Sequence, residues 1–295
     1  MPPVHDRQDY ALLSLGVLCA STSPPLIAAC AAPALAIAFW RTGAAALVLL
    51  PALLLRREHR GLHRRAALLA VLAGAALAAH FGTFIPSLSY TSVASAAALV
   101  CSQAVWAGLL SRALGERMPG RAWLGTAVCL AGVLLITGVD VSLSGDALLG
   151  DLLALLGGVF GGVYIVTGGF VRRELSTLSY TLICYGVCGV LLLVVCVIGG
   201  QSLAGYAAAD WARIAALTVL GQLFGHSLFN LVLRSISPTI VSLASLFTVP
   251  LAAVIAAVAL GQTPPTAAVP ALALLLAGTA IVISAREREA SSASA

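Results

Sequence analysis

Two histidines lie deep inside long apolar stretches, where a titratable side chain is costly. His80 and His226 are 146 residues apart, and each lies in the third apolar stretch of its half of the chain. Histidine changes charge near neutral pH, so the pair could form two steps of one polar pathway. At about 1.5 Å of rise per residue, we expect the rings on the order of 10–15 Å apart along the membrane normal. Alternatively, each ring bonds a neighbouring backbone.

A polar stripe runs through the second histidine. Gln222, His226 and Asn230 recur every four residues in an otherwise apolar stretch, which places them on one helix face. That face must turn inward, where it either bonds neighbouring helices or contacts a solute. Elsewhere Ser102 and Trp106 share a helix face in the first half, and Tyr164 offers a ring and a hydroxyl in the second. The predicted substrate-binding residues are His80, Ser102, Trp106, Tyr164, Gln222, His226 and Asn230.

Prolines and a glycine could bend or break some of these helices. Pro24 and Pro25 follow a polar run in the first apolar stretch. Proline removes a backbone hydrogen bond, and broken helices often line transport sites, although a purely structural kink is the alternative. By the same reasoning we predict gating hinges at Pro24, Pro25, Pro86, Gly225 and Pro250.

Arg41 is the one charge well inside a predicted helix. Its long stem could carry the guanidinium to the membrane surface, or the guanidinium could cap carbonyls at a helix end. We favour such a structural role. Pairing with a substrate carboxylate is the alternative.

No catalytic or metal-binding pattern accompanies these residues. The predicted spans contain no central carboxylate, and the chain has no phosphate-binding loop. Seven cysteines, an odd number without zinc-like spacing, all fall in apolar stretches, where they serve as small buried side chains. We therefore predict no catalytic residue, no metal and no cofactor. An intramembrane enzyme that pairs Ser102 or Ser227 with a histidine is the alternative.

Transmembrane helices must position these side chains. The chain is 60% hydrophobic and 9% charged, whereas ordinary soluble domains are about 25% charged. We therefore predict an all-α polytopic membrane protein. Ten stretches approach or exceed the roughly 20 helical residues that cross a bilayer, at residues 10–31, 34–55, 66–87, 92–114, 120–137, 149–170, 178–199, 211–233, 239–260 and 267–284.

Arginines predict the orientation of these helices. All 16 basic residues are arginine, and an N-terminus inside the cell leaves 14 of them on the cytoplasmic side, as the positive-inside rule requires. Both termini are then cytoplasmic. The formal charge of +5 therefore does not indicate a nucleic-acid partner, because the arginines are explained by their position on one face of the membrane.

The chain is an internal duplication. Residues 90–136 match residues 236–282, so that the turn at Leu114 and Gly115 corresponds to Leu260 and Gly261. The first turn is arginine-rich and the second uncharged, and five helices per copy is an odd number, so the second copy must be inverted. The predicted units are a first repeat at 10–137, an extracytoplasmic connector at 138–148, a second repeat at 149–284 and a disordered cytoplasmic tail at 285–295.

The repeat and its turn resemble the drug/metabolite transporter superfamily of the EamA type. Phe39-Trp40-Arg41 in the second helix and Leu114-Gly115-Glu116-Arg117 before the fifth carry the resemblance. It implies ten helices, with helices 1, 3, 4, 6, 8 and 9 around a central cavity. It also implies a secondary exporter in a bacterial inner membrane.

The expected function is export of small amphipathic metabolites, foremost amino acids, by alternating access between the repeats. The expected partners are the small-molecule substrate and the lipid bilayer, and a monomer suffices because both halves share one chain. A multidrug or nucleoside exporter of the same fold is one alternative. A membrane receptor or scaffold that transports nothing is another.

Overall fold

The computed structural model describes residues 7–56, 63–115, 119–143, 145–263, 266 and 269–293, and all regular elements in these residues are helices. The first half of the chain forms seven of them: α1 (Arg7–Ser21), α2 (Ser23–Ala28), α3 (Ala34–Arg56), α4 (Arg64–Ser87), α5 (Val93–Val100), α6 (Gln103–Ala113) and α7 (Gly120–Leu143). The second half forms α8 (Gly145–Val171), α9 (Thr177–Ile198), α10 (Ala208–Ala216), the π-helix η2 (Leu217–His226), α11 (Ser227–Val232), α12 (Pro238–Ala244), the 3₁₀ helix η3 (Ser245–Phe247), α13 (Thr248–Leu260) and α14 (Val269–Ala293).

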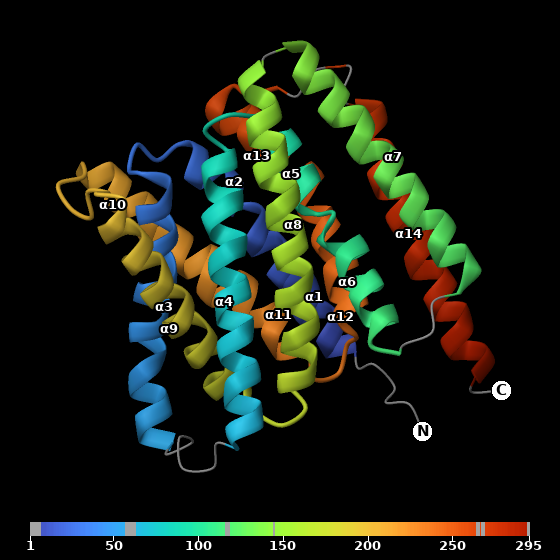
Figure 1. Ribbon diagram of the computed structural model, residues 1–295, viewed down its shortest axis with the longest axis horizontal. Coiled ribbons are helices and arrows are strands. Elements are labelled where there is room, and N and C mark those ends of the chain that lie inside the picture. Colours follow the sequence, from blue (N-terminus) through green and yellow to red (C-terminus); the bar gives the residue numbers. More distant parts are fainter. Residues whose placement is uncertain are drawn as a thin grey trace.

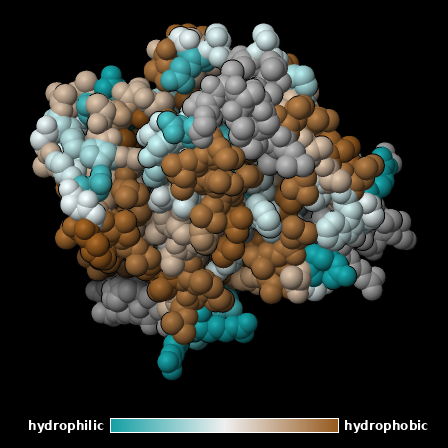
Figure 2. All heavy atoms as spheres, turned by 45° about the horizontal axis from the view of Figure 1, so that its top comes forward, coloured by the Kyte–Doolittle hydropathy of each residue, from teal (hydrophilic) through white to brown (hydrophobic). Residues whose placement is uncertain are grey.

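Within the described residues, eight helical segments are long and apolar enough to cross a membrane, and they are Arg7–Ala28, Ala34–Arg56, Arg64–Ser87, Val93–Ala113, Asp146–Val171, Thr177–Ile198, Ala208–Val232 and Pro238–Leu260. Several pair two short helices into one crossing, as α5 and α6 do. Large apolar side chains such as Leu55 and Val258 are 84% exposed, and Figure 2 shows broad hydrophobic areas on the surface. Lipid is the solvent such a surface requires.

α7 and α14 occupy the predicted fifth and tenth spans. They pack against each other along one flank of the bundle (Figure 1). Both are helical, as expected, but ten membrane crossings and the cytoplasmic location of the termini stay predictions. The start of α1 and the end of α14 do lie toward the same end of the bundle (Figure 1).

Helix packing repeats between the two halves. α3 packs on α9 and α7 on α14, which joins each helix to its own counterpart in the other repeat. α4 packs on α8, while α1 packs on η2. The third helix of one half therefore packs on the first helix of the other half in both cases. The duplication in the sequence is thus also a duplication of packing.

Two segments differ from the expected boundaries. α7 and α8 extend into the predicted connector at 138–148, and α14 continues to Ala293 through most of the predicted disordered tail at 285–295. Alanine, arginine and glutamate, which dominate the start of that tail, are strong helix formers. Residues 116–118 of the first repeat turn, and residues 264, 265, 267 and 268 of the second, lie outside the described residues.

Candidate functional site

A small chamber of about 70 Å³ is lined by residues from both halves of the chain. Its lining comes from the broken first helix, from α4, α8 and η2, and from the segments around the interruptions of the fourth and ninth spans. These are the six helices that the resemblance implies, and Arg41 of α3 adds the second helix. The polar residues of the lining are Ser23, Arg41, His80, Gln103, Tyr164, His226, Ser245 and Thr248.

The backbone is irregular in several of the segments that line this chamber. Pro24 and Pro25 start α2 after the break at Thr22, and Cys101 and Ser102 form a turn between α5 and α6. The 3₁₀ helix η3 interrupts the ninth span in the same way. η2 is a ten-residue π-helix; π-helices are rare overall, and those that occur are often at functional sites. Irregular backbone at membrane depth is tolerated where protein buries it or where it lines a cavity.

Arg41 is buried, with 1% of its surface exposed. Its Nε donates to Oε1 of Gln222 across 3.0 Å, and its guanidinium carbon lies 4.2 Å from the ring centroid of Phe81. The stem therefore does not carry the charge to the membrane surface, and that expectation is wrong. A desolvated cation–π contact is worth about 2 kcal/mol, less than the several kcal/mol that burying an ion costs.

The two predicted histidines meet in the chamber. Their ring centroids are 6.4 Å apart, closer than the expected separation on the order of 10–15 Å, which assumed straight α-helices along the membrane normal. His226 instead ends the π-helix η2. Nδ1 of His80 lies 2.8 Å from the carbonyl oxygen of Gly157. Because a carbonyl only accepts, Nδ1 donates, and a neutral ring keeps Nε2 as an acceptor.

The polar stripe of η2 and α11 divides between two uses. Gln222 bonds Arg41, and His226 lines the chamber. Oδ1 of Asn230 accepts a 2.6 Å hydrogen bond from the Tyr164 hydroxyl, and its Nδ2 lies 3.4 Å from Oγ1 of Thr181. The ends of the stripe therefore bond α3, α8 and α9, while its middle faces the cavity.

The two interrupted spans are tied together across the chamber. Nε2 of Gln103 donates to Oγ of Ser245 across 2.8 Å. The Cys101 sulfur lies 3.5 Å from the Ser245 carbonyl oxygen and 3.7 Å from Oγ1 of Thr248. Residues at the interruption of the fourth span thus contact residues at the interruption of the ninth span, in the other repeat.

Ser102 and Trp106 are not in the chamber lining. Trp106 is 37% exposed, and Ser102 is buried against Gly158 of α8. The expected shared face assumed one continuous helix, but the turn at Cys101 and Ser102 interrupts it. Gln103 reaches the chamber instead.

The predicted hinges lie at different places in the fold. Pro24 lines the chamber, and Pro86 lies one residue before the end of α4. Pro250 is the third residue of α13. Gly225 packs so closely on α1 that a β-carbon there would lie 3.3 Å from Ala20. Their role in gating stays a prediction.

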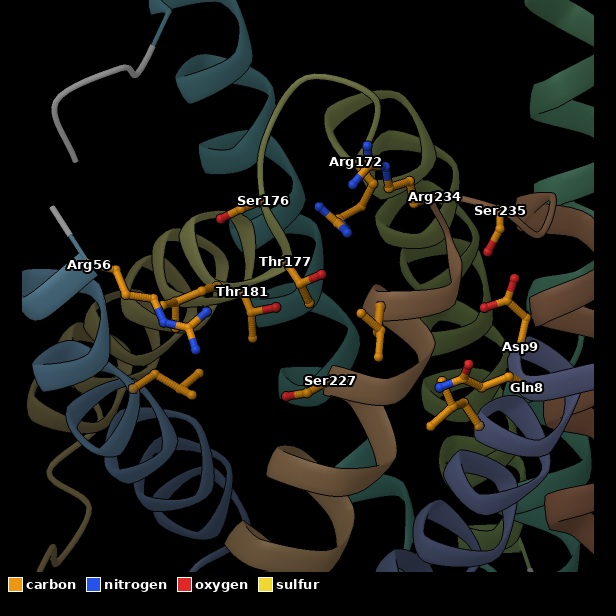
Figure 3. A pocket seen from close by; sticks show the side chains of 14 residues that line it. Gln8, Asp9, Arg56, Arg172, Ser176, Thr177, Thr181, Ser227, Arg234 and Ser235 are labelled. Carbon is orange, nitrogen blue, oxygen red and sulfur yellow. The ribbon is translucent and has the colours of Figure 1, made fainter. Parts of the chain in front are cut away.

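A second, larger cavity opens beside the chamber. This vestibule, of about 840 Å³, is lined by Gln8, Asp9, Leu12, Leu49, Arg56, Arg172, Ser176, Thr177, Leu178, Thr181, Ser227, Leu231, Arg234 and Ser235. Figure 3 shows Arg56 on one wall and Arg172 with Arg234 on another. Burial, and then the like charge of Arg234, lower the pKa of Arg172. Cations outnumber the single acid of the lining, so the vestibule favours anions.

A thin barrier separates the vestibule from the chamber. Ser227 lines the vestibule and the preceding His226 lines the chamber. The Tyr185 hydroxyl lies 3.1 Å from Oγ of Ser227 and donates across 3.1 Å to the carbonyl oxygen of Gln222. The two linings thus meet at the consecutive residues His226 and Ser227, and the Tyr185 hydroxyl hydrogen-bonds on both sides of His226.

Arg41, Ser23 and Gln103 line the chamber but are not among the predicted substrate-binding residues. All three are polar residues inside predicted apolar spans, which was the available signal. For Arg41 the signal was seen but assigned to structure. For Gln103, a continuous helix would place Trp106 at the site, whereas the turn at Cys101 and Ser102 brings Gln103 there.

A multi-pass helical membrane protein with duplicated packing and a polar chamber between the halves has the architecture of a solute transporter. The EamA-like transporter family matches residues 9–138 and 148–284. The chain therefore belongs to the EamA-like transporter family, which confirms the resemblance and the two-repeat pattern. Membership of a transporter family is consistent with a protein that is not an enzyme.

A solved structure described only as "Crystal structure of protein" shares the fold. It is 19% identical, the alignment covers 96% of this chain and 99% of that chain, and the TM-score is 0.70. At this identity the similarity concerns the fold alone. No curated protein matches the chain.

Proposed function

We propose that the protein exports small amphipathic metabolites, amino acids above all, across a bacterial inner membrane by alternating access. The observation that carries this proposal is the series of two cavities, a vestibule of about 840 Å³ and a chamber of about 70 Å³. Their linings meet at the consecutive residues His226 and Ser227. A receptor or scaffold would need no such path toward the centre of the bundle.

The proposal includes two inverted repeats of five spans with both termini in the cytoplasm. The arginine distribution supports this orientation, because Arg56, Arg172 and Arg234 all line the vestibule, and arginines gather on the cytoplasmic side. The vestibule would then open to the cytoplasm. The structure would correspond to the state that receives substrate for export.

In our proposal, polar contacts hold the opposite end of the bundle closed. Oδ1 of Asp210 accepts from the backbone N–H of Ala31 across 3.1 Å and pairs with Arg213 at 2.7 Å. The indole nitrogen of Trp40 donates to the carbonyl of Leu203 across 2.9 Å. In our proposal these contacts open when the vestibule closes.

The moving parts would be the spans whose backbone is irregular at the chamber. α5 with α6, η2 with α11, and α12 with α13 each change helix type or direction beside it. The chamber holds space for about two waters at roughly 30 Å³ each, so a metabolite enters only when these segments move apart. One chain contains all of them, and we expect the monomer to function.

Flux through proteoliposomes of the purified chain tests the proposal. We expect saturable movement of at least one amino acid, reduced in His226→Ala and in Gln222→Ala while expression is unchanged. Any pH dependence of flux should disappear when His80 and His226 are both replaced by glutamine. Absence of saturable flux for amino acids, nucleosides and cationic dyes alike would refute transport and favour a receptor or scaffold.

A further inference from the structure

The charge of Arg41 has no counter-ion in the described part of the chain. Its guanidinium donates to the Gln222 amide and lies over the Phe81 ring, and Nη2 is buried without a hydrogen-bond partner among the described residues. A buried ion normally has an opposite charge beside it. Because Arg41 lines the chamber, the missing anion has a place to bind.

Three more polar atoms around Arg41 are buried without a partner in the described residues. They are Oγ of Ser23, Nε2 of Gln222 and Nδ1 of His226. A β-carbon placed on Gly221 would lie 2.2 Å from the Ser23 oxygen and 3.2 Å from Nη2 of Arg41. Those two atoms therefore lie close to each other beside Gly221, where any larger residue would clash with the Ser23 hydroxyl.

The chemistry of these atoms selects the ligand. Nη2 of Arg41 only donates hydrogen bonds. The Gln222 oxygen accepts from Arg41, so the free atom of that amide is the nitrogen Nε2, which also only donates. A serine hydroxyl and a neutral histidine nitrogen can each donate as well. A carboxylate accepts from all four, whereas an ammonium or a cationic dye finds a positive charge and no acceptor on two of them.

We infer that Arg41, Ser23 and Gln222, with His226 beside them, form a subsite for a substrate carboxylate in the chamber. This inference rests on the proposed transport function and narrows it to carboxylate-bearing solutes, either anions or zwitterions. Cationic drugs are excluded by the unpaired guanidinium. A chamber of about 70 Å³ has room for a carboxylate group. The rest of the solute would enter when the surrounding segments move apart.

The vestibule supports the same selection. Arg56, Arg172 and Arg234 line it, against the single carboxylate of Asp9. Fixed positive charge in a cleft raises the local concentration of anions. A carboxylate would thus meet the exposed Arg56 and Arg234 in the vestibule and then the buried Arg41 in the chamber.

Matched ligands on the wild-type protein give the first test. The assay measures counterflow of labelled L-leucine into proteoliposomes at constant chloride and phosphate. Unlabelled leucine, 4-methylpentanoate, leucinamide and 3-methylbutylamine are each added as competing ligands. If leucine gives no counterflow, the same acid, amide and amine series is built on whichever solute of an amino-acid, nucleoside and dye panel does. We expect the two carboxylates to inhibit at concentrations at least tenfold lower than the amide or the amine.

Equal inhibition by the amide or amine, saturable flux of a cationic dye, or inhibition by chloride or phosphate equal to that by the carboxylates would overturn the inference while transport stands. No flux of any solute would instead refute the proposed function. The two failures are therefore distinguishable.

Variants give the second test, read by thermal shift as well as flux. Arg41→Gln should abolish stabilisation by the carboxylate series, and Arg41→Lys should restore part of it. Arg65→Gln is the matched control, because Arg65 is exposed near the start of α4. Carboxylate stabilisation that survives in Arg41→Gln would overturn the assignment. If Arg41→Gln fails to fold, the ligand series on the wild-type protein still decides.

Discussion

Replacing Gln222 by glutamate would place a carboxylate beside Arg41 with almost no change of shape. The amide oxygen already lies 3.0 Å from Nε of Arg41, so the new carboxylate would be a fixed counter-ion of the guanidinium. Gln222→Leu is the matched comparison, since it removes the hydrogen bond without adding charge.

The two variants should differ in stability. With charge centres about 4 Å apart and an effective dielectric constant of about 20, the new attraction is worth about 4 kcal/mol. Desolvating the carboxylate costs several kcal/mol, so the terms roughly cancel and Gln222→Glu should stay close to wild type. Gln222→Leu loses a hydrogen bond to a charged group, about 1.5–3 kcal/mol, with no offset.

Denaturation midpoints in detergent, measured for wild type and both variants, test this order. Transport should fall in both variants, in Gln222→Glu because the glutamate occupies Arg41 and in Gln222→Leu because the guanidinium loses its orientation. A Gln222→Glu protein that unfolds before Gln222→Leu would refute the reasoning. It would mean that Arg41 is already neutralised.

Three further predictions concern packing, closure and the barrier. Gly74→Ala should destabilise by about 1–3 kcal/mol, because its β-carbon would lie 2.8 Å from the backbone of α9, whereas Gly186→Ala, with no atom within 4 Å, should be neutral or stabilising in the same unfolding assay. Asp210→Ala should speed labelling of Cys30 by a membrane-impermeant maleimide applied from the extracytoplasmic side, since it frees the segment after α2; an unchanged rate would contradict the proposed closure. Tyr164→Phe should cost about 1–3 kcal/mol of stability by leaving a buried acceptor unpaired where the 2.6 Å bond now lies, and a smaller change would show that water replaces the hydroxyl.

The helices were predictable because the bilayer sets their length and composition. All ten predicted spans are helical over most of their length in the described residues, and the shift of 146 residues that pairs His80 with His226 matches the packing of the halves. A span needs about 20 apolar residues whatever its neighbours are. That requirement is local, so it is visible in the sequence.

The irregular backbone was less predictable because tertiary packing determines it. Proline marks the break before α2, but the turn at Cys101 and Ser102 contains none, and neither does η2. Without these breaks, helical periodicity assigned Trp106 to the site in place of Gln103. The depth of Arg41 was visible, but the direction of its side chain depends on Gln222, which is 181 residues away.

The scaffold is duplicated, whereas the chemistry of the chamber is not. Shifting by 146 residues pairs His80 with His226 but pairs Arg41 with Val187 and Gln222 with Ala76. The proposed carboxylate subsite therefore exists once, on one side of a chamber that both repeats enclose. Under the proposed alternating access, symmetric packing would let either end open at similar cost, because each contact has a counterpart. The one-sided donors would hold the solute in one orientation in both states. If the subsite were duplicated, a carboxylate could bind in two opposed orientations, and the histidine pair would no longer face a defined part of the solute.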